Sequence, residues 1–127
     1  MTTYDFVGED IPKLFEVVGV RPAERGISVQ AHSWRGGVAT VELTAEQAHE
    51  FVQIIATHLT KVRLTDREEF FESVGEAYYE VGVSHGYRDG RLCILVSEGD
   101  IYAKVELTVE QTNELSEIIK AHLPNPE

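Results

Sequence analysis

The segment from Ser84 to Asp89, SHGYRD, holds the densest set of reactive side chains in this 127-residue chain. It offers a hydroxyl nucleophile, an imidazole base and a guanidinium group that binds anions. The first half of the chain has RPAERG at the corresponding place and keeps only the arginine. Because catalytic triads are defined by geometry and not by adjacency in sequence, the segment favours a polar hairpin turn over a catalytic site.

The histidines and the single cysteine give no metal-binding pattern. No two histidines lie four residues apart or form an HxH motif, whereas zinc sites need several ligands at short spacings. Cys93 lies in the apolar run LCILV, which indicates a buried and unreactive thiol. We therefore predict no catalytic residue, no bound metal and no cofactor. The histidines are His32, His49, His58, His85 and His122.

The strongest feature of the sequence is an internal repeat. Residues 38–59, VATVELTAEQAHEFVQIIATHL, match residues 102–123, YAKVELTVEQTNELSEIIKAHL, at 12 of 22 positions without a gap. In each copy, apolar residues first alternate, as in a half-buried strand, and then recur at helical spacing. A threonine and a glutamine three residues apart, at the spacing of a helix capping box, join the two patterns. Each copy therefore predicts a strand that runs into an amphipathic helix.

The segments upstream of each copy predict two further strands, at Leu14–Val20 and Ile27–Trp34 in the first half of the chain and at Tyr78–Ser84 and Arg91–Ser97 in the second. We therefore predict an α+β fold of tandem duplicated βββα units. Their strands form antiparallel sheet, their helices pack on it, and the two units are related by a pseudo-twofold axis.

The predicted units occupy residues 14–59 and 78–123 of a single domain, 1–127, because two independent halves of this size would each be marginally stable. Residues 1–12 predict an irregular arm or a short strand. Residues 60–77 predict an acidic linker, helical from residue 65, where a threonine and a glutamate stand at capping-box spacing. The echo of FVGE at residues 6–9 in SVGE at residues 73–76 hints that the duplication extends upstream.

The repeated string VELTxEQxxELxxIIxxHL resembles the strand-to-helix ending, often read as LTPEQA, of small uncharacterised proteins of high-GC Gram-positive bacteria and their phages. It covers Val41–Leu59 and Val105–Leu123. The resemblance implies a small accessory or phage-encoded protein and brings no site residues with it.

The net charge of −11, from 22 acidic and 11 basic side chains, favours a basic protein partner and disfavours direct binding to nucleic acid or to anionic membranes. The sequence has no signal peptide and no apolar run long enough to cross a bilayer, so we expect a cytoplasmic protein. Our first hypothesis is a non-catalytic interaction protein, an inhibitor or modulator of a basic or nucleic-acid-binding target. The carboxylates expected to contact it are Asp66, Glu68, Glu69, Glu72 and Glu76 on the linker, with Glu46, Glu50, Glu110 and Glu114 on the predicted helices.

The alternative hypothesis is a small ligand-binding protein or enzyme with a pocket between the two repeats. His85, Arg88 and Asp89 from the reactive segment would lie at the edge of that pocket. So would His58 and His122, which the repeat relates to each other. Because no carboxylate or cysteine recurs with these two histidines at ligand spacing, the sequence favours last-turn residues that pack their rings and interact with the negative end of their helices.

An apolar surface is a further candidate for partner binding. With the repeat offset of 64 residues, Ser28, Gln30 and His32 correspond to Leu92, Ile94 and Val96, so the strand Arg91–Ser97 is apolar on both faces. Together with Trp34 and Tyr102, these residues predict either a protein contact, with a homodimer slightly favoured, or a face covered by another segment of the chain.

Overall fold

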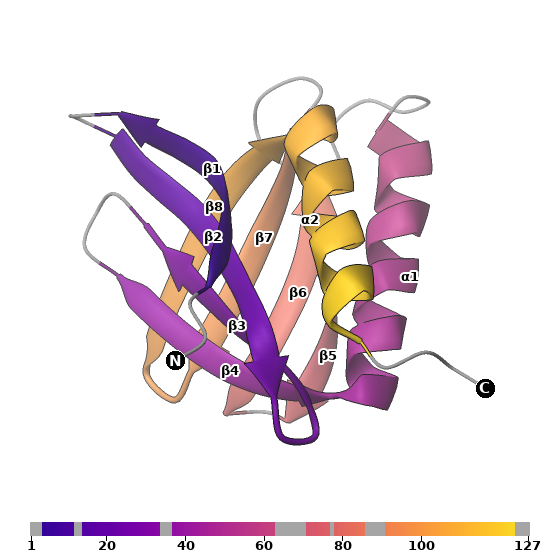
Figure 1. The fold of residues 1–127 in the computed structure, drawn as a ribbon. Coiled ribbons are helices and arrows are strands. Elements are labelled where there is room, and N and C mark those ends of the chain that lie inside the picture. Colours follow the sequence, from indigo (N-terminus) through magenta and orange to yellow (C-terminus); the bar gives the residue numbers. More distant parts are fainter. Residues whose placement is uncertain are drawn as a thin grey trace.

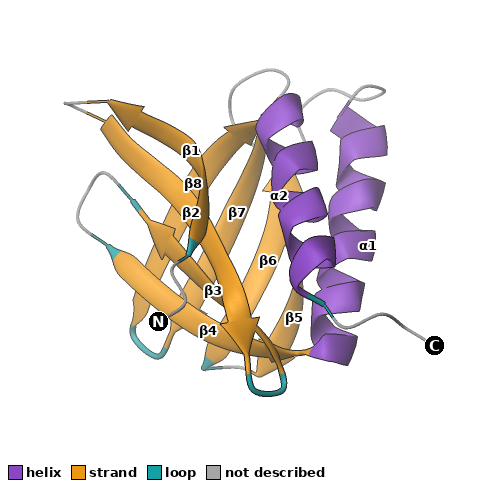
Figure 2. Ribbon diagram, viewed as in Figure 1, coloured by secondary structure: helices purple, strands orange, loops and turns teal. Residues whose placement is uncertain are grey.

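The computed structural model describes residues 4–11, 14–33, 37–62, 71–76, 78–85 and 91–123. These form two four-stranded antiparallel meanders, each followed by a helix (Figure 1; Figure 2). The α+β fold predicted from the sequence is confirmed, and each unit begins with one strand more than predicted. The first unit comprises β1 (Asp5–Ile11), β2 (Leu14–Ala23), β3 (Gly26–His32), β4 (Val38–Thr44) and α1 (Ala45–Val62). The second comprises β5 (Glu72–Glu76), β6 (Tyr79–His85), β7 (Arg91–Glu98), β8 (Ile101–Thr108) and α2 (Val109–His122).

The additional strands β1 and β5 settle two expectations. The short strand expected within residues 1–12 is β1, whereas the helix expected over residues 65–77 is wrong for Glu72–Glu76, which form β5. Residues 63–70 lie outside the described residues. Val7 and Val74 are both buried, and the glycine after each has a positive φ of 139° or 107°. Such a backbone conformation is open to glycine and is not helical. The threonine and glutamate at capping-box spacing therefore do not make residues 72–76 helical, because these residues pair with β6 instead.

Each helix packs mainly on the sheet of the other unit, an arrangement that we call helix exchange. α1 contacts β5 and β6 more extensively than its own strands, and α2 likewise contacts β1 and β2. The helices lie side by side on one flank of the molecule (Figure 1). Because each helix lays its apolar stripe on the sheet of the other unit, neither unit has a complete core by itself.

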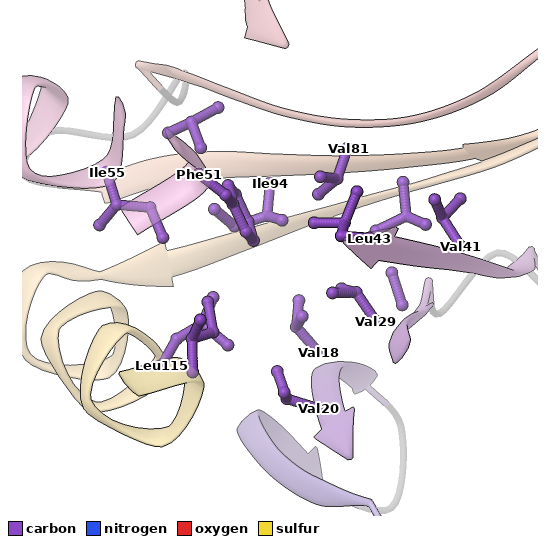
Figure 3. Close-up of a cluster of buried hydrophobic side chains, with 14 of the residues drawn as sticks. Val18, Val20, Val29, Val41, Leu43, Phe51, Ile55, Val81, Ile94 and Leu115 are labelled. Atoms are coloured by element: carbon purple, nitrogen blue, oxygen red, sulfur yellow. The ribbon is translucent and has the colours of Figure 1, made fainter. Parts of the chain in front are cut away.

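The core fills the space between the two sheets and the helices (Figure 3). β4 lies against β7 and β8, so the inward faces of the two sheets meet there. Phe51 and Ile55 of α1 and Leu115 and Ile119 of α2 are fully buried against these faces. The inward side chains of the central strands, all at most 3% exposed, are Ile27, Val29, Ala31, Val41, Leu43, Leu92, Ile94, Val96, Val105 and Leu107.

The strand register overturns the predicted outer apolar face. Ile27 pairs with Leu43 and Leu92 pairs with Leu107, so the structural counterpart of Ile27 is Leu92, 65 residues later. Five residues separate the paired His32 and Val38, whereas four separate their counterparts Ser97 and Tyr102. A shift of one residue moves a strand's side chains to the opposite face. Leu92, Ile94 and Val96 are therefore core residues with 0% exposure. Of the two expectations, cover within the chain is the one that the structure shows, and these residues form no exposed partner-binding face.

Candidate functional site

A pocket of about 650 Å³ opens where the two units meet. On one side it is lined by residues 23–25 of the β2–β3 turn, residues 40–44 of β4 and Gln47 at the start of α1. On the other side are Gly75 and Glu76 of β5, Tyr79 of β6 and Glu98 of β7. The pocket therefore depends on the assembly of the two sheets and not on either sheet alone.

The pocket is acidic. Glu24, Glu42, Glu76 and Glu98 line it, and Arg25 is the cation among the lining residues that the structure describes. Glu24, Glu42 and Glu76 are exposed, and Glu98 is half-buried. Carboxylates that line a concave surface focus a negative potential there, which attracts basic ligands and raises their rate of association. Of the linker carboxylates proposed from the sequence, Glu76 lies in this pocket.

One wall of the pocket is the free edge of β4. The Thr40 N–H donates to Glu98 Oε1 at 3.1 Å, and the Thr44 N–H donates to Gln47 Oε1 at 3.0 Å. These two amides point away from β3. In an antiparallel ladder, alternate residues direct their N–H and C=O groups to the same side, so the N–H and C=O of Glu42 also point away from β3, into the pocket.

In the second unit, the amide equivalent to that of Glu42 is already bound. There the Glu106 N–H, the counterpart of the Glu42 N–H, donates to Glu16 Oε1 at 3.3 Å. The pairs Glu9–Glu16 and Glu76–Tyr79 occupy equivalent places in the two sheets, so Tyr79 is the counterpart of Glu16. Tyr79 supplies no carboxylate. Within the described part of the chain, no side chain accepts a hydrogen bond from the Glu42 N–H.

Exposed apolar side chains surround this end of the second sheet. Tyr79 and Glu98 pair across β6 and β7, and Glu98 pairs in turn with Ile101 of β8. The Gly99 N–H donates to the Tyr78 carbonyl, which brings the β5–β6 and β7–β8 turns together. We call this group the aromatic rim: Tyr78 (71% exposed), Tyr79 (52%), Ile101 (52%) and Tyr102 (63%).

The two repeat-related histidines hold the exchanged helices. His58 of α1 lies 2.9 Å from Glu72 of β5, between Nε2 and Oε2, and His122 of α2 lies 2.7 Å from Asp5 of β1, between Nε2 and Oδ2. The carboxylates are also counterparts, since each precedes the buried valine of its strand by two residues. The sequence concealed these pairs because each carboxylate comes from the strand on which the exchanged helix packs. Each histidine thus links its helix to the first strand of the other unit.

The sequence-predicted pocket residues are only partly brought together. The rings of His58 and His85 are in edge contact, with centroids 5.0 Å apart. His122 belongs to the other helix, and none of the three histidines lines the pocket. Burial lowers the pKa of His58, and its hydrogen bond to Glu72 opposes that shift. Arg88, Asp89, Trp34, Asp66, Glu68 and Glu69 lie outside the described residues, so the predictions made for them stay predictions.

The remaining chemistry is sparse. Burial raises the pKa of the Cys93 thiol to about 11, which leaves almost no thiolate near neutral pH. Among the described residues, no three His, Cys, Asp or Glu side chains are placed to hold a metal ion. Neither of the described helices has the length and apolar character needed to cross a membrane.

No family model and no curated protein matches the chain. The resemblance of the repeated motif to small proteins of Gram-positive bacteria and their phages therefore stays a prediction.

Proposed function

We propose that this protein is a non-catalytic binding protein for a basic segment of a partner protein, held in the acidic pocket between the two units. The observation that carries the proposal is the composition of the pocket wall, with four carboxylates against one guanidinium, beside the aromatic rim. Carboxylates bind lysine and arginine through charge-assisted hydrogen bonds. Tyrosine rings add contact area and cation–π attraction at low entropic cost.

The net charge of the whole chain indicates the type of partner. A chain with a net charge of −11 is repelled by nucleic acid, but it complements the surfaces that bind nucleic acid. A protein that covers such a basic surface competes with the nucleic acid for it. Inhibition or modulation of a basic or nucleic-acid-binding target is therefore the form of activity that this proposal favours.

The test uses labelled peptides of defined charge. A peptide of five Lys-Thr repeats should bind with an affinity that falls steeply as the salt concentration rises, whereas a peptide of five Glu-Thr repeats should not bind. The Debye length shrinks from about 8 Å at physiological salt to about 3 Å at 1 M. Fluorescence anisotropy measures both affinities. Failure of the Lys-Thr peptide to bind would contradict the proposal.

Matched variants locate the site. Glu42→Lys combined with Glu76→Lys reverses two charges in the pocket, and we expect it to weaken binding by at least about tenfold, because like charges replace attractive ones. Glu50→Lys combined with Glu114→Lys makes the same change of net charge on exposed helix positions outside the pocket. If both double variants lose affinity equally, net charge and not the pocket governs binding.

A small ligand is the alternative occupant, because a pocket of about 650 Å³ lies within the range of small-molecule sites. A bound ligand raises the melting temperature by mass action. A thermal-shift screen of small cationic metabolites against the wild type and the Glu42→Lys, Glu76→Lys variant tests this alternative. Stabilisation of the wild type alone would favour it.

A further inference from the structure

We infer that the basic segment binds as an added strand on the free edge of β4, with the N–H and C=O groups of Glu42 pairing with its backbone. This inference rests on the proposed function and specifies how the pocket recognises its ligand. β4 is an edge strand of its sheet, and its central residues form a wall of the pocket. Extended peptides commonly bind at such edges, where backbone hydrogen bonds supply affinity and side-chain contacts supply specificity.

The hydrogen bonds along β4 define how much of the edge is available. The Thr40 N–H is bound by the Glu98 carboxylate and the Thr44 N–H by the Gln47 amide, so side chains of this protein already bind the outward amides at both ends. Glu42 lies between them and presents the open donor and acceptor. A ligand strand therefore has its central contact at Glu42 and reaches towards Glu98 on one side.

The two units differ at the central amide of the edge strand, which is open in β4 and bound in β8. The Glu16 carboxylate reaches across the units and binds the equivalent amide of Glu106 on β8. Tyr79 stands in the place of Glu16 and leaves the amide of Glu42 available. Proteins usually block exposed strand edges because such edges template aggregation. A central edge amide that is bound in one unit and open in the other, beside a pocket, has the form of a binding site.

The negative charge of the pocket favours a basic segment of another protein over a second copy of this chain. A second copy of this chain would bring its own carboxylates and a net charge of −11 against the acidic pocket, and that charge opposes self-pairing. Successive side chains of an extended ligand point to opposite faces of the sheet. A segment with a basic residue at every second position therefore presents all its cations on one face, where the pocket carboxylates of Glu42, Glu76 and Glu98 can receive them.

The first experiment alters the ligand backbone and leaves the protein unchanged. Two versions of the Lys-Thr peptide carry N-methyl groups, one on every lysine amide and the other on every threonine amide. Both keep the charge, but each loses one of the two alternating sets of N–H donors. Strand addition predicts that one version loses at least about tenfold in affinity while the other binds like the parent peptide. Equal affinities of the two versions would overturn strand addition.

The second experiment closes the edge. Tyr79→Glu introduces a carboxylate at the place of Glu16, which binds the equivalent amide of β8. Strand addition therefore predicts weaker binding of the Lys-Thr peptide, by at least about tenfold. Attraction of charges alone predicts tighter binding, because the variant is more acidic. Tyr79→Phe keeps the ring and should retain most of the affinity. Unchanged or tighter binding by Tyr79→Glu would contradict the inference.

The outcomes separate the inference from the proposed function. If the unmodified Lys-Thr peptide does not bind, both the proposed function and strand addition are wrong. If that peptide binds but both methylated versions bind equally, only strand addition fails. Light scattering should give the mass of a monomer for the wild type. A dimer that Tyr79→Glu dissociates would instead assign the β4 edge to a second copy of the chain and overturn the inference.

Discussion

Replacing Ile94 by alanine tests the strand register on which this interpretation of the molecule depends. Ile94 is 0% exposed and pairs with Val105 in the middle of β7 and β8. The change removes three carbon atoms, each worth about 0.8 kcal/mol of transfer free energy. The cavity that remains adds to this loss, and measured costs of such truncations are about 2 to 5 kcal/mol. Because Ile94 packs among side chains of both sheets and α1 (Figure 3), we expect about 3 to 4 kcal/mol.

The matched control is Leu95→Ala, the next residue on the same strand. This substitution removes the same number of carbon atoms, but Leu95 is half-buried on the opposite face of the strand. We therefore expect it to lower the free energy of unfolding by about 1 kcal/mol. Urea unfolding followed by circular dichroism measures both free energies. The melting temperature of Ile94→Ala should fall by roughly 11 to 15 °C, given the usual relation between stability and melting temperature in a domain of this size.

The ranking of these two variants decides the register. If Leu95→Ala costs more than Ile94→Ala, then Leu95 and not Ile94 lies in the core. In that case the alignment with an offset of 64 residues extends through β7, and the outer apolar face expected from the sequence exists. Equal and small costs would contradict both assignments.

Three further outcomes follow. Because burial lowers the pKa of His58 below its usual value of 6.5, the unfolded chain binds this proton more readily, and the free energy of unfolding should decrease as the pH falls below 6.5. His58→Gln should show a smaller decrease between pH 7 and pH 5 in urea unfolding, and an unchanged slope would contradict this assignment. Cys93, with a pKa of about 11, should react with a thiol reagent at pH 8 only after denaturation, so rapid labelling of the folded protein would refute its burial. Thr108→Ala removes the hydroxyl that accepts from the Gln111 N–H at 3.1 Å and should cost about 1 kcal/mol in the same unfolding assay, with no loss counting against the cap.

Local patterns in the sequence determined the repeated strand-to-helix element. Ala39, Val41 and Leu43 alternate with polar residues, and all three are buried in β4, as their counterparts are in β8. Both capping boxes form, because the glutamine of each lies one helical turn from its threonine. These predictions succeeded because strand alternation and helix capping depend on residues only a few positions apart.

Tertiary structure alone decided which face of β7 is buried and which sheet each helix covers. A difference of one residue in a hairpin connection turns Leu92, Ile94 and Val96 inward, and periodicity cannot detect this in a strand that is apolar on both faces. Exchange of the helices creates the pairs of His58 with Glu72 and of His122 with Asp5, whose partners are 14 and 117 residues apart. The open edge of β4 likewise depends on which side chain of the other unit reaches it. These features are set by packing between distant segments, which no local pattern of residues encodes.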